Sequence, residues 1–109
     1  DTFEQFAAPL LRKLAWPTLL CHRLVVENDR ITGYQLRVPE QKQKAVAALK
    51  LLNYRVISAG DSFNDTAMLG EADVGFLFRA PQNVKDRFPQ FRPVDEYDEL
   101  LRLIRDAMA

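Results

Sequence analysis

A short apolar run that ends in an acidic loop constrains the fold of this chain more than any other feature. Residues 54–59 read Tyr-Arg-Val-Ile-Ser-Ala, and the loop Gly-Asp-Ser-Phe-Asn-Asp follows at residues 60–65. A buried parallel strand has this mainly apolar character, and in α/β sheets the carboxyl ends of such strands carry the ligand-binding loops. Asn64 or Asp65 can then cap a short helix that runs to residue 72. The segment therefore predicts a strand, a functional loop and a helix in succession.

The rest of the chain alternates between helical and extended patterns. Helical spacing of apolar residues occurs in four further segments, at residues 2–14, 40–53, 82–88 and 95–108. Extended, apolar runs occur in four others, at residues 18–27, 31–38, 74–78 and 91–94. The first two extended runs flank a polar turn and predict a hairpin. The overall alternation predicts an α/β fold with a parallel core sheet flanked by helices.

Several side chains receive structural interpretations from these patterns. We expect Asp1 or Thr2 to cap the first helix and Pro39 to occupy the first turn of the second one. Cys21 and His22 are adjacent on a strand, point to opposite faces, and are interpreted as packing residues. Arg79 and Arg87 are expected on the surface. Core positions are assigned to the aromatic and last-helix apolar residues, namely Phe76, Phe78, Phe88, Phe91, Tyr97, Leu100, Leu103, Ile104 and Met108.

Composition narrows the class of protein. The chain has 109 residues, 48% of them hydrophobic, which predicts one globular domain over residues 1–109. Fifteen basic and 15 acidic side chains cancel, so a charge-driven binder of nucleic acid or anionic lipid is disfavoured. A single cysteine and the lack of an uncharged stretch near about 18 residues predict a reduced, cytoplasmic protein that does not span a membrane. Asp1 opens directly into a helical pattern, which predicts a fragment or a processed start.

The acidic loop has a chemical and a purely structural interpretation. Asp61 and Asp65 are two carboxylates four residues apart, with Ser62 and Asn64 as neutral polar neighbours. Mg²⁺ is held in this way, by one or two carboxylates together with water and a substrate phosphate. Most of these residues also form turns, so a capped turn without a ligand is the competing interpretation. An EF-hand calcium loop is excluded because its alternating oxygen ligands and closing glutamate are absent.

The loop and the Thr-Ala-Met-Leu stretch after it closely resemble the fourth motif of haloacid dehalogenase superfamily phosphatases, which reads G-D-x-x-N-D with a following Met-Leu. This resemblance implies that Asp61 is a direct Mg²⁺ ligand. It implies that Asp65 is a catalytic outer-shell acid that orients metal-bound water, and that Asn64 contacts the substrate or its phosphate.

Phosphoryl transfer also needs a cation besides the metal, and a lysine near a helix start can supply it. Lys42 and Lys44 are candidates, although a solvated helix face is the ordinary interpretation of such lysines. Alignment of residues 33–37 with the resembled family places Lys42 at the third-motif lysine, in a catalytic and phosphate-binding role, and keeps Lys44 in reserve. The resemblance also implies that the backbone amide of Asp1 lies near the phosphate.

The likeness extends over most of the chain. Residues 16–22, 33–37, 54–69 and 88–91 resemble the bacterial subgroup of phosphoserine phosphatases that also acts as a homoserine phosphotransferase. This implies a partial Rossmann-like core, a C-terminal part of such an enzyme, without the strand that carries the nucleophilic aspartate and without the cap. The complete enzyme would use Mg²⁺ and an aspartyl-phosphate in serine and threonine biosynthesis, with a phosphoserine-like metabolite as its partner. We expect this chain alone to be inactive, and to self-associate or to pair with the N-terminal half.

The sequence has two other functional interpretations. A non-catalytic Mg²⁺-binding or interaction module derived from the same fold fits the absence of a nucleophile. A response-regulator receiver is disfavoured because its acidic pair precedes its lysine, whereas Lys42 precedes Asp61 here. The sequence leaves open the physiological substrate and acceptor, the oligomeric state, the identity of the nucleophile and cap residues, and whether the chain is a truncation or a natural short protein.

Overall fold

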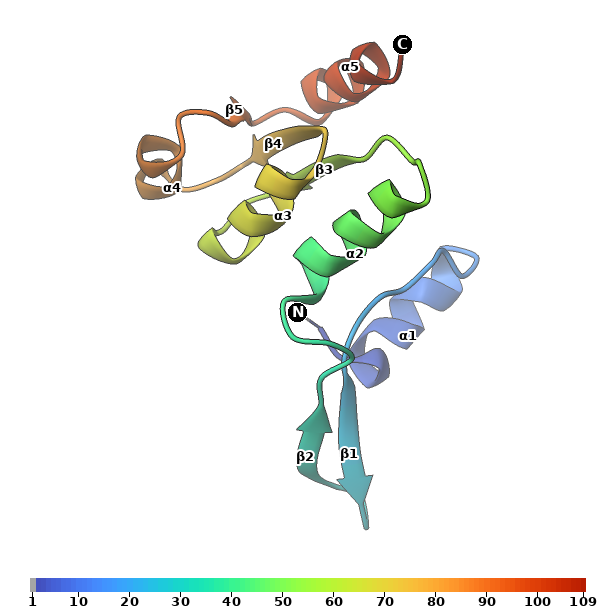
Figure 1. The fold of residues 1–109 in the computed structure, drawn as a ribbon. Coiled ribbons are helices and arrows are strands. Elements are labelled where there is room, and N and C mark those ends of the chain that lie inside the picture. The colour runs from blue at the N-terminus through green and yellow to red at the C-terminus, as the bar shows by residue number, and fades with distance from the viewer. Residues whose placement is uncertain (1) are drawn as a thin grey trace. The chain divides into compact units, whose positions relative to one another are not determined.

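The computed structural model describes residues 2–109, and the chain divides into two compact units, Asp1–Gln41 and Lys42–Ala109. Figure 1 labels the helices and strands along the chain. Among residues 2–109, none of the helices combines the length and the apolar character that crossing a lipid bilayer would require.

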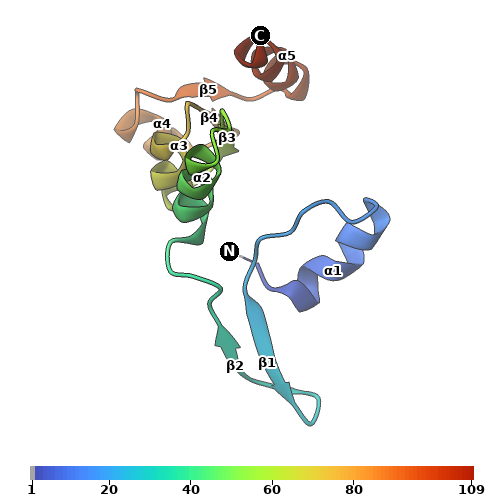
Figure 2. The same ribbon diagram turned by 45° about the vertical axis from the view of Figure 1, so that its right-hand side comes forward.

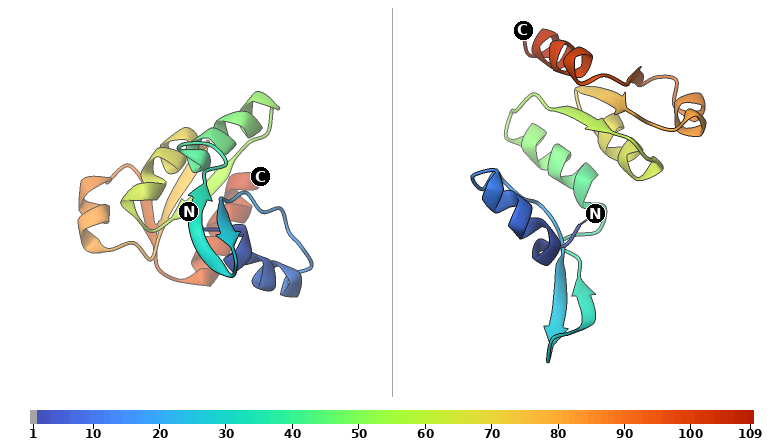
Figure 3. Two further views of the ribbon diagram at one scale, coloured as in Figure 1. Left: turned by 90° about the horizontal axis from the view of Figure 1, so that it is seen from below. Right: turned by 180° about the vertical axis from the view of Figure 1, so that it is seen from behind.

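The first unit is a helix followed by a hairpin. Its elements are α1 (Glu4–Lys13), β1 (Arg23–Glu27) and β2 (Arg30–Gln35). The two strands pair antiparallel, as the sequence predicted, and Figure 3 shows the ribbon that they form. The turn between the strands is formed by Asn28 and Asp29, whose φ angles are 50° and 60°. These angles lie in the left-handed region, which Asn and Asp tolerate. Leu11, His22 and Leu24 are buried in this unit, as is Gln41 at its boundary.

The second unit contains a parallel sheet and its helices. Helix α2 (Gln41–Leu51) begins at the boundary residue, and β3 (Ile57–Gly60) leads into the short 3₁₀ turn η1 (Phe63–Asp65) and α3 (Thr66–Glu71). The remaining elements are β4 (Val74–Phe78), α4 (Gln82–Arg87), β5 (Arg92–Val94) and α5 (Tyr97–Met108). The strands lie in the order β3-β4-β5, and both pairings are parallel. The predicted α/β class is therefore confirmed, with helices on either side of a parallel sheet.

Alternate residues of the central strand β4 face two separate apolar clusters. Leu77 belongs to a cluster on the α3 and α4 side, whose buried members are Leu69, Leu77, Ala80 and Val84. Phe76, the preceding residue, packs with Val94 and Leu103 on the α5 side. Figure 2 shows the corresponding layers, with α5 on one side of the strands and α2 and α3 on the other. The period-two alternation of a strand thus holds the parallel sheet between two helical layers.

Several local predictions were wrong at the ends of elements. Phe3, and not Thr2, is the N-cap of α1, and it makes no side-chain capping bond, while the alternative cap Asp1 lies outside the described residues. Pro39 precedes α2, because Glu40 takes a left-handed φ of 53° and the helix begins only at Gln41. Helix caps depend on where the chain enters the helix, which apolar spacing does not encode.

Two predicted core residues lie at the surface. Met108 is 71% exposed, because it occupies the last turn of α5 beyond the residues that pack on the sheet. Tyr97 is 64% exposed, and its ring lies 4.9 Å from the ring of Phe78 at the rim of the cluster. The other predicted core residues are buried or partly buried, with Phe76 and Leu103 inside and Leu100 and Ile104 against them.

Candidate functional site

The acidic loop begins where β3 ends. Gly60 is the last residue of β3 and pairs with Leu77 of β4, so Asp61 stands at the carboxyl edge of the parallel sheet. The amide of Asp65 donates to the carbonyl of Ser62 at 3.0 Å and closes the η1 turn before α3. The sheet therefore presents the loop at the edge where α/β folds bind ligands.

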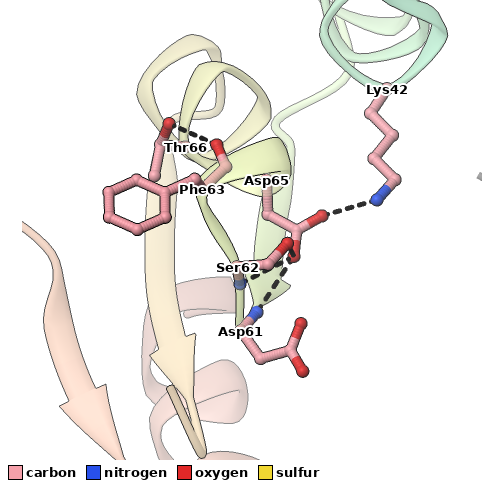
Figure 4. A network of polar contacts seen from close by, with 6 residues as sticks. All are labelled: Lys42, Asp61, Ser62, Phe63, Asp65 and Thr66. Carbon is pink, nitrogen blue, oxygen red and sulfur yellow. Dashed lines mark hydrogen bonds and ion pairs between the residues drawn. The ribbon is translucent and has the colours of Figure 1, made fainter. Parts of the chain in front are cut away.

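Asp65 organises this loop through one of its two carboxylate oxygens. Oδ2 accepts hydrogen bonds from the amides of Asp61 at 3.0 Å and Ser62 at 3.2 Å, and from the Ser62 hydroxyl at 3.1 Å. Figure 4 shows these contacts converging on a single side chain. Asp65 precedes α3 at the N-cap position, but its carboxylate makes no capping bond to that helix. The predicted cap is therefore correct in position only, because the side chain turns back to the loop.

The other oxygen of Asp65 accepts a hydrogen bond from Lys42. Lys42 Nζ lies 2.6 Å from Asp65 Oδ1, and the two side chains are 31% and 8% exposed. Lys42 is the second residue of α2, 23 positions before its partner, so tertiary folding brings them together. Lys44, the reserve candidate, lies two residues further along α2 and is exposed. Of the two candidate lysines, Lys42 is thus the one that the structure places on the loop.

Gly60 is required by how closely Asp65 packs against the strand. A Cβ atom at residue 60 would lie 2.6 Å from both Cγ and Oδ2 of Asp65, far inside van der Waals contact. The backbone at Gly60 is not in the left-handed region, so the requirement is for space rather than for backbone freedom. The glycine of the motif therefore makes room for the buried carboxylate.

The surroundings of Asp65 favour its charged form. Burial by itself raises the pKa of the carboxyl group, but the hydrogen bond from Lys42, the amides of Asp61 and Ser62, and the charge of Lys42 together outweigh it. The net effect is a pKa below the ordinary value of 3.8. Asp65 is consequently an acceptor at neutral pH, with every described contact on it coming from a donor.

Asp61 differs from Asp65 in exposure and direction. The Asp61 side chain is exposed, and in Figure 4 its carboxylate points away from that of Asp65. Asn64 is likewise exposed, within η1. Asp1, predicted to lie near the phosphate, is outside the described residues. The loop thus separates one inward, fully engaged carboxylate from one outward carboxylate.

This donor set fits a magnesium site with few protein ligands. No group of three or more His, Cys, Asp or Glu side chains among residues 2–109 is arranged to hold a metal, so a closed all-protein cage is not formed by that part of the chain. Mg²⁺ does not require one, since it is held by one or two carboxylates with waters and a phosphate. The exposed Asp61 carboxylate can serve as such a ligand. Both Asp65 oxygens already accept hydrogen bonds, which suits a role outside the direct coordination shell.

Sequence patterns alone did not reveal how the outer face of the loop is held. The Phe63 ring lies edge-on to Phe88 at 5.9 Å between centroids, and the Arg87 guanidinium lies 5.8 Å from the Phe63 ring. The Thr66 hydroxyl donates to the Phe63 carbonyl at 2.8 Å. Figure 4 shows the Phe63 side chain on the side of the turn opposite the Asp65 carboxylate. An aromatic residue between polar ones was the available signal for this anchor.

In the first unit, Cys21 and His22 border a hollow of about 610 Å³. His22 is buried, and its Nδ1 accepts a hydrogen bond from the Arg37 amide at 3.1 Å. Its ring also lies 6.3 Å from that of Phe3, which pairs with it in a parallel bridge. These contacts give His22 the packing role that the sequence predicted.

No protein-family model matches the chain. A phosphoserine phosphatase of Pseudomonas syringae is 58% identical over 101 residues, which are 92% of this chain and 43% of that protein. The phosphoserine phosphatase ThrH of Pseudomonas aeruginosa is 55% identical over 103 residues, which are 94% of this chain and 50% of that protein. The chain spans about half the length of the curated relatives it matches.

Solved structures agree on the fold. A substrate-bound phosphoserine phosphatase matches with a TM-score of 0.74 at 19% identity, covering 93% of this chain and 51% of that one. A phosphoserine phosphatase with an analogue of its phospho-aspartyl intermediate matches with a TM-score of 0.72 at 20% identity, covering 93% and 52%. In sequence this chain is therefore similar to a C-terminal portion of these phosphoserine phosphatases, and its fold is that of the corresponding part of the solved ones.

Proposed function

We propose that this chain supplies the metal-binding and lysine half of a Mg²⁺-dependent phosphoserine phosphatase that also transfers phosphoryl groups to homoserine. The observation that carries the proposal is the 2.6 Å contact between Lys42 and Asp65 beside the exposed carboxylate of Asp61. This contact brings the Lys42 cation and the exposed Asp61 carboxylate together at the carboxyl edge of the sheet. Phosphoryl transfer depends mainly on such positioning and on charge neutralisation.

Each residue has a distinct part in this proposal. Asp61 holds Mg²⁺, which when bound neutralises charge on the phosphoryl oxygens. Lys42 places a second positive charge beside the phosphate, and Asp65 keeps its Nζ in position. Asn64, exposed on the η1 turn, hydrogen-bonds the substrate or its phosphate. The backbone amide of Asp1 is a further phosphate contact in this assignment.

The nucleophilic aspartate, which would carry the phosphoryl group as an aspartyl-phosphate, comes from residues outside this sequence. Strand β3 lies at one edge of the described sheet order, so its second edge can pair with a further strand. Ser58, in the middle of β3, is buried, and its hydroxyl has no hydrogen-bond partner among the described residues. That hydroxyl lies on a face of the sheet and does not report on the edge, whereas the backbone groups along an open edge are normally paired or covered, which supports a strand docked there. We propose that this strand belongs to the N-terminal half, with self-association as the substitute when that half is absent.

Complementation tests the proposal directly. The chain is mixed or co-expressed with the N-terminal portion of the Pseudomonas aeruginosa relative, and phosphate release from phosphoserine is measured with and without Mg²⁺. We expect Mg²⁺-dependent hydrolysis by the mixture and none by the chain alone. Asp61→Asn and Lys42→Met should each abolish the activity, whereas Lys44→Met, a matched change at an exposed lysine of the same helix, should retain it. Adding homoserine should divert phosphoryl groups from water to its hydroxyl.

A non-catalytic Mg²⁺-binding module is the competing function. It is favoured by one observation, that these 109 residues contain no apolar strand ending in Asp-x-Asp or Asp-x-Glu. The module would bind Mg²⁺ through Asp61 but give no turnover in any complemented mixture. An in-frame upstream coding sequence with such a strand, and with a serine directly before Asp1, would favour the enzyme. Hydrolysis by the chain alone that disappears in Asp61→Asn would contradict both functions as stated.

A further inference from the structure

Helix α2 carries a second lysine contact at the end remote from Lys42. Lys50 Nζ donates to the carbonyl of Glu71 at 2.8 Å and lies 3.7 Å from Asp73 Oδ1. Glu71 ends α3, and Asp73 directly precedes β4. The last turn of α2 is therefore attached to the segment that joins α3 to the central strand.

The acceptors of Lys50 are themselves held against the sheet. Asp73 Oδ2 accepts a hydrogen bond from the Val56 amide at 2.8 Å, and the Asp73 amide donates to the Val56 carbonyl at 2.9 Å. Val56 directly precedes β3, so this reciprocal pair joins the entrances of β3 and β4. The amide of Val56 lowers the pKa of Asp73, and the charge of Lys50 adds to this effect. Lys50 thus contacts a fixed point at the amino ends of the strands.

Few apolar contacts hold α2 in place along its axis. Within the second unit, Val46 is the one α2 residue among the buried core positions. With a single buried side chain near its middle, the helix meets little resistance from packing to sliding along its axis or rotating about that residue. Lys42 and Lys50 are eight residues apart, which is about 12 Å along the axis. Contacts at both ends, over that span, can set the position of the helix where packing alone does not.

We propose that Lys50 is a positioning residue that, through the Glu71 carbonyl and Asp73, fixes α2 along its axis and so holds Lys42 on Asp65. Its relevance to phosphoryl transfer rests on the proposed function of Lys42. The proposed effect of Lys50 on the position of Lys42 does not depend on that function, since it concerns only how α2 is held at its two ends. Lys50 touches neither Asp61 nor Asp65 in the described contacts and acts only through α2.

Chemical acetylation of lysines in the full chain, followed by peptide mass spectrometry, tests this positioning. The lysine amine is the nucleophile that attacks the reagent, so a lysine whose Nζ is hydrogen-bonded to a carboxylate and partly buried reacts more slowly than an exposed one. In the native chain we expect Lys42 to react several-fold more slowly than Lys44. Lys85, which pairs with Asp95 at 3.2 Å and is 21% exposed, serves as an internal monitor of the folded state.

The decisive variant is Lys50→Met, which keeps most of the apolar stem and removes the charge. We expect Lys42 to become as reactive as Lys44 while Lys85 stays slow. Lys50→Arg, which retains charge and donors, should restore slow labelling of Lys42. Unchanged labelling of Lys42 in Lys50→Met would overturn the proposal.

Asp73→Asn decides the matter if Lys50→Met fails to fold, which faster labelling of Lys85 would reveal. This change removes the charge opposite Lys50 but keeps an oxygen for the Val56 amide. Faster labelling of Lys42 with Lys85 unchanged supports the positioning role, and slow labelling of Lys42 overturns the part of it that is assigned to Asp73.

Turnover separates this proposal from the proposed function. In a complemented, active mixture, Lys50→Met should lower kcat more than it changes KM, with recovery in Lys50→Arg. If no mixture is active, the proposed function fails, while the labelling result still decides whether Lys50 positions Lys42.

Discussion

At the scale of single residues, Asp65 is the side chain on which the candidate site depends. One of its oxygens accepts from Lys42, and the other accepts from two amides and a hydroxyl of the loop. It therefore links α2 to the carboxyl end of β3 while lying almost completely buried. A buried carboxylate that accepts four hydrogen bonds requires both the shape and the negative charge of aspartate at this position.

Asp65→Asn should destabilise the second unit by about 2 kcal/mol at neutral pH, since an amide nitrogen would face donors and Lys42 would lose its counter-charge. The pKa of Asp65 is lowered in the folded chain, so its contribution to stability is present above its unfolded pKa. That contribution is lost as the pH falls through the lower folded value. Urea unfolding at pH 7 and near pH 3 should therefore show a deficit in Asp65→Asn that shrinks in acid. An equal deficit at both pH values would contradict this account.

Gly60→Ala should displace Asp65 and cost about 2 kcal/mol of stability, because the added methyl group overlaps the carboxylate. Gly33→Ala is the matched control. A Cβ there meets Val25 at 3.9 Å, an ordinary contact, so the change should be nearly neutral. Thermal unfolding of the two variants measures the difference. Equal stability of both would show that Asp65 is not packed against Gly60.

At the scale of elements, the helices are held by different means. Helix α5 is amphipathic and packs Leu103 into the cluster formed by Phe76 and Val94. Helix α2 contributes Val46 to the buried core and is attached at both ends by lysine contacts. The site consequently relies on polar contacts to hold the helix that carries its cation, and on apolar packing elsewhere.

Leu103→Ala should cost about 3 kcal/mol, as expected for truncation of a buried leucine that leaves a cavity. Leu101→Ala, on the same helix at a position that is 47% exposed, should cost less than about 1 kcal/mol. Chemical denaturation of both variants tests whether α5 packs through the assigned stripe. A larger effect at Leu101 would place the other face of α5 against the sheet.

At the scale of the whole molecule, the chain forms two compact units of unequal make-up. The second has a three-stranded parallel sheet with apolar clusters on both faces. The first has a two-stranded ribbon, and β2 presents exposed residues along nearly its whole length. Isolated two-stranded ribbons are only marginally stable in water, so local stability should differ between the units.

Hydrogen exchange should reveal this difference. Amides of β4, which pairs on both edges and is covered on both faces, should exchange at least about tenfold more slowly than those of β1 and β2. Exchange measured by NMR or mass spectrometry on the intact chain provides the test. Uniform protection across both units would show that they open together.

The local pattern of the sequence determined most elements and the motif. Extended apolar runs and helical spacing located the strands and helices to within about five residues, and β4 to its observed bounds, because burial selects apolar side chains at these positions. The relation to known phosphatases followed from a contiguous loop, which needs no folding to be recognised. Helix caps, the exposure of Met108 and the anchoring of Phe63 were not predictable, since each depends on residues distant in the chain.

Which lysine meets the loop was decided by the tertiary structure. The resemblance favoured Lys42 and kept Lys44 in reserve, and the folded chain places Lys42 Nζ against Asp65 across 23 positions. The inward turn of Asp65, the outward turn of Asp61 and the need for Gly60 appear only in the folded loop, through contacts among residues 60–65. The sequence by itself determined which groups are present and their order. The fold decided which of them meet, because contacts between distant residues depend on how helices and strands pack in space.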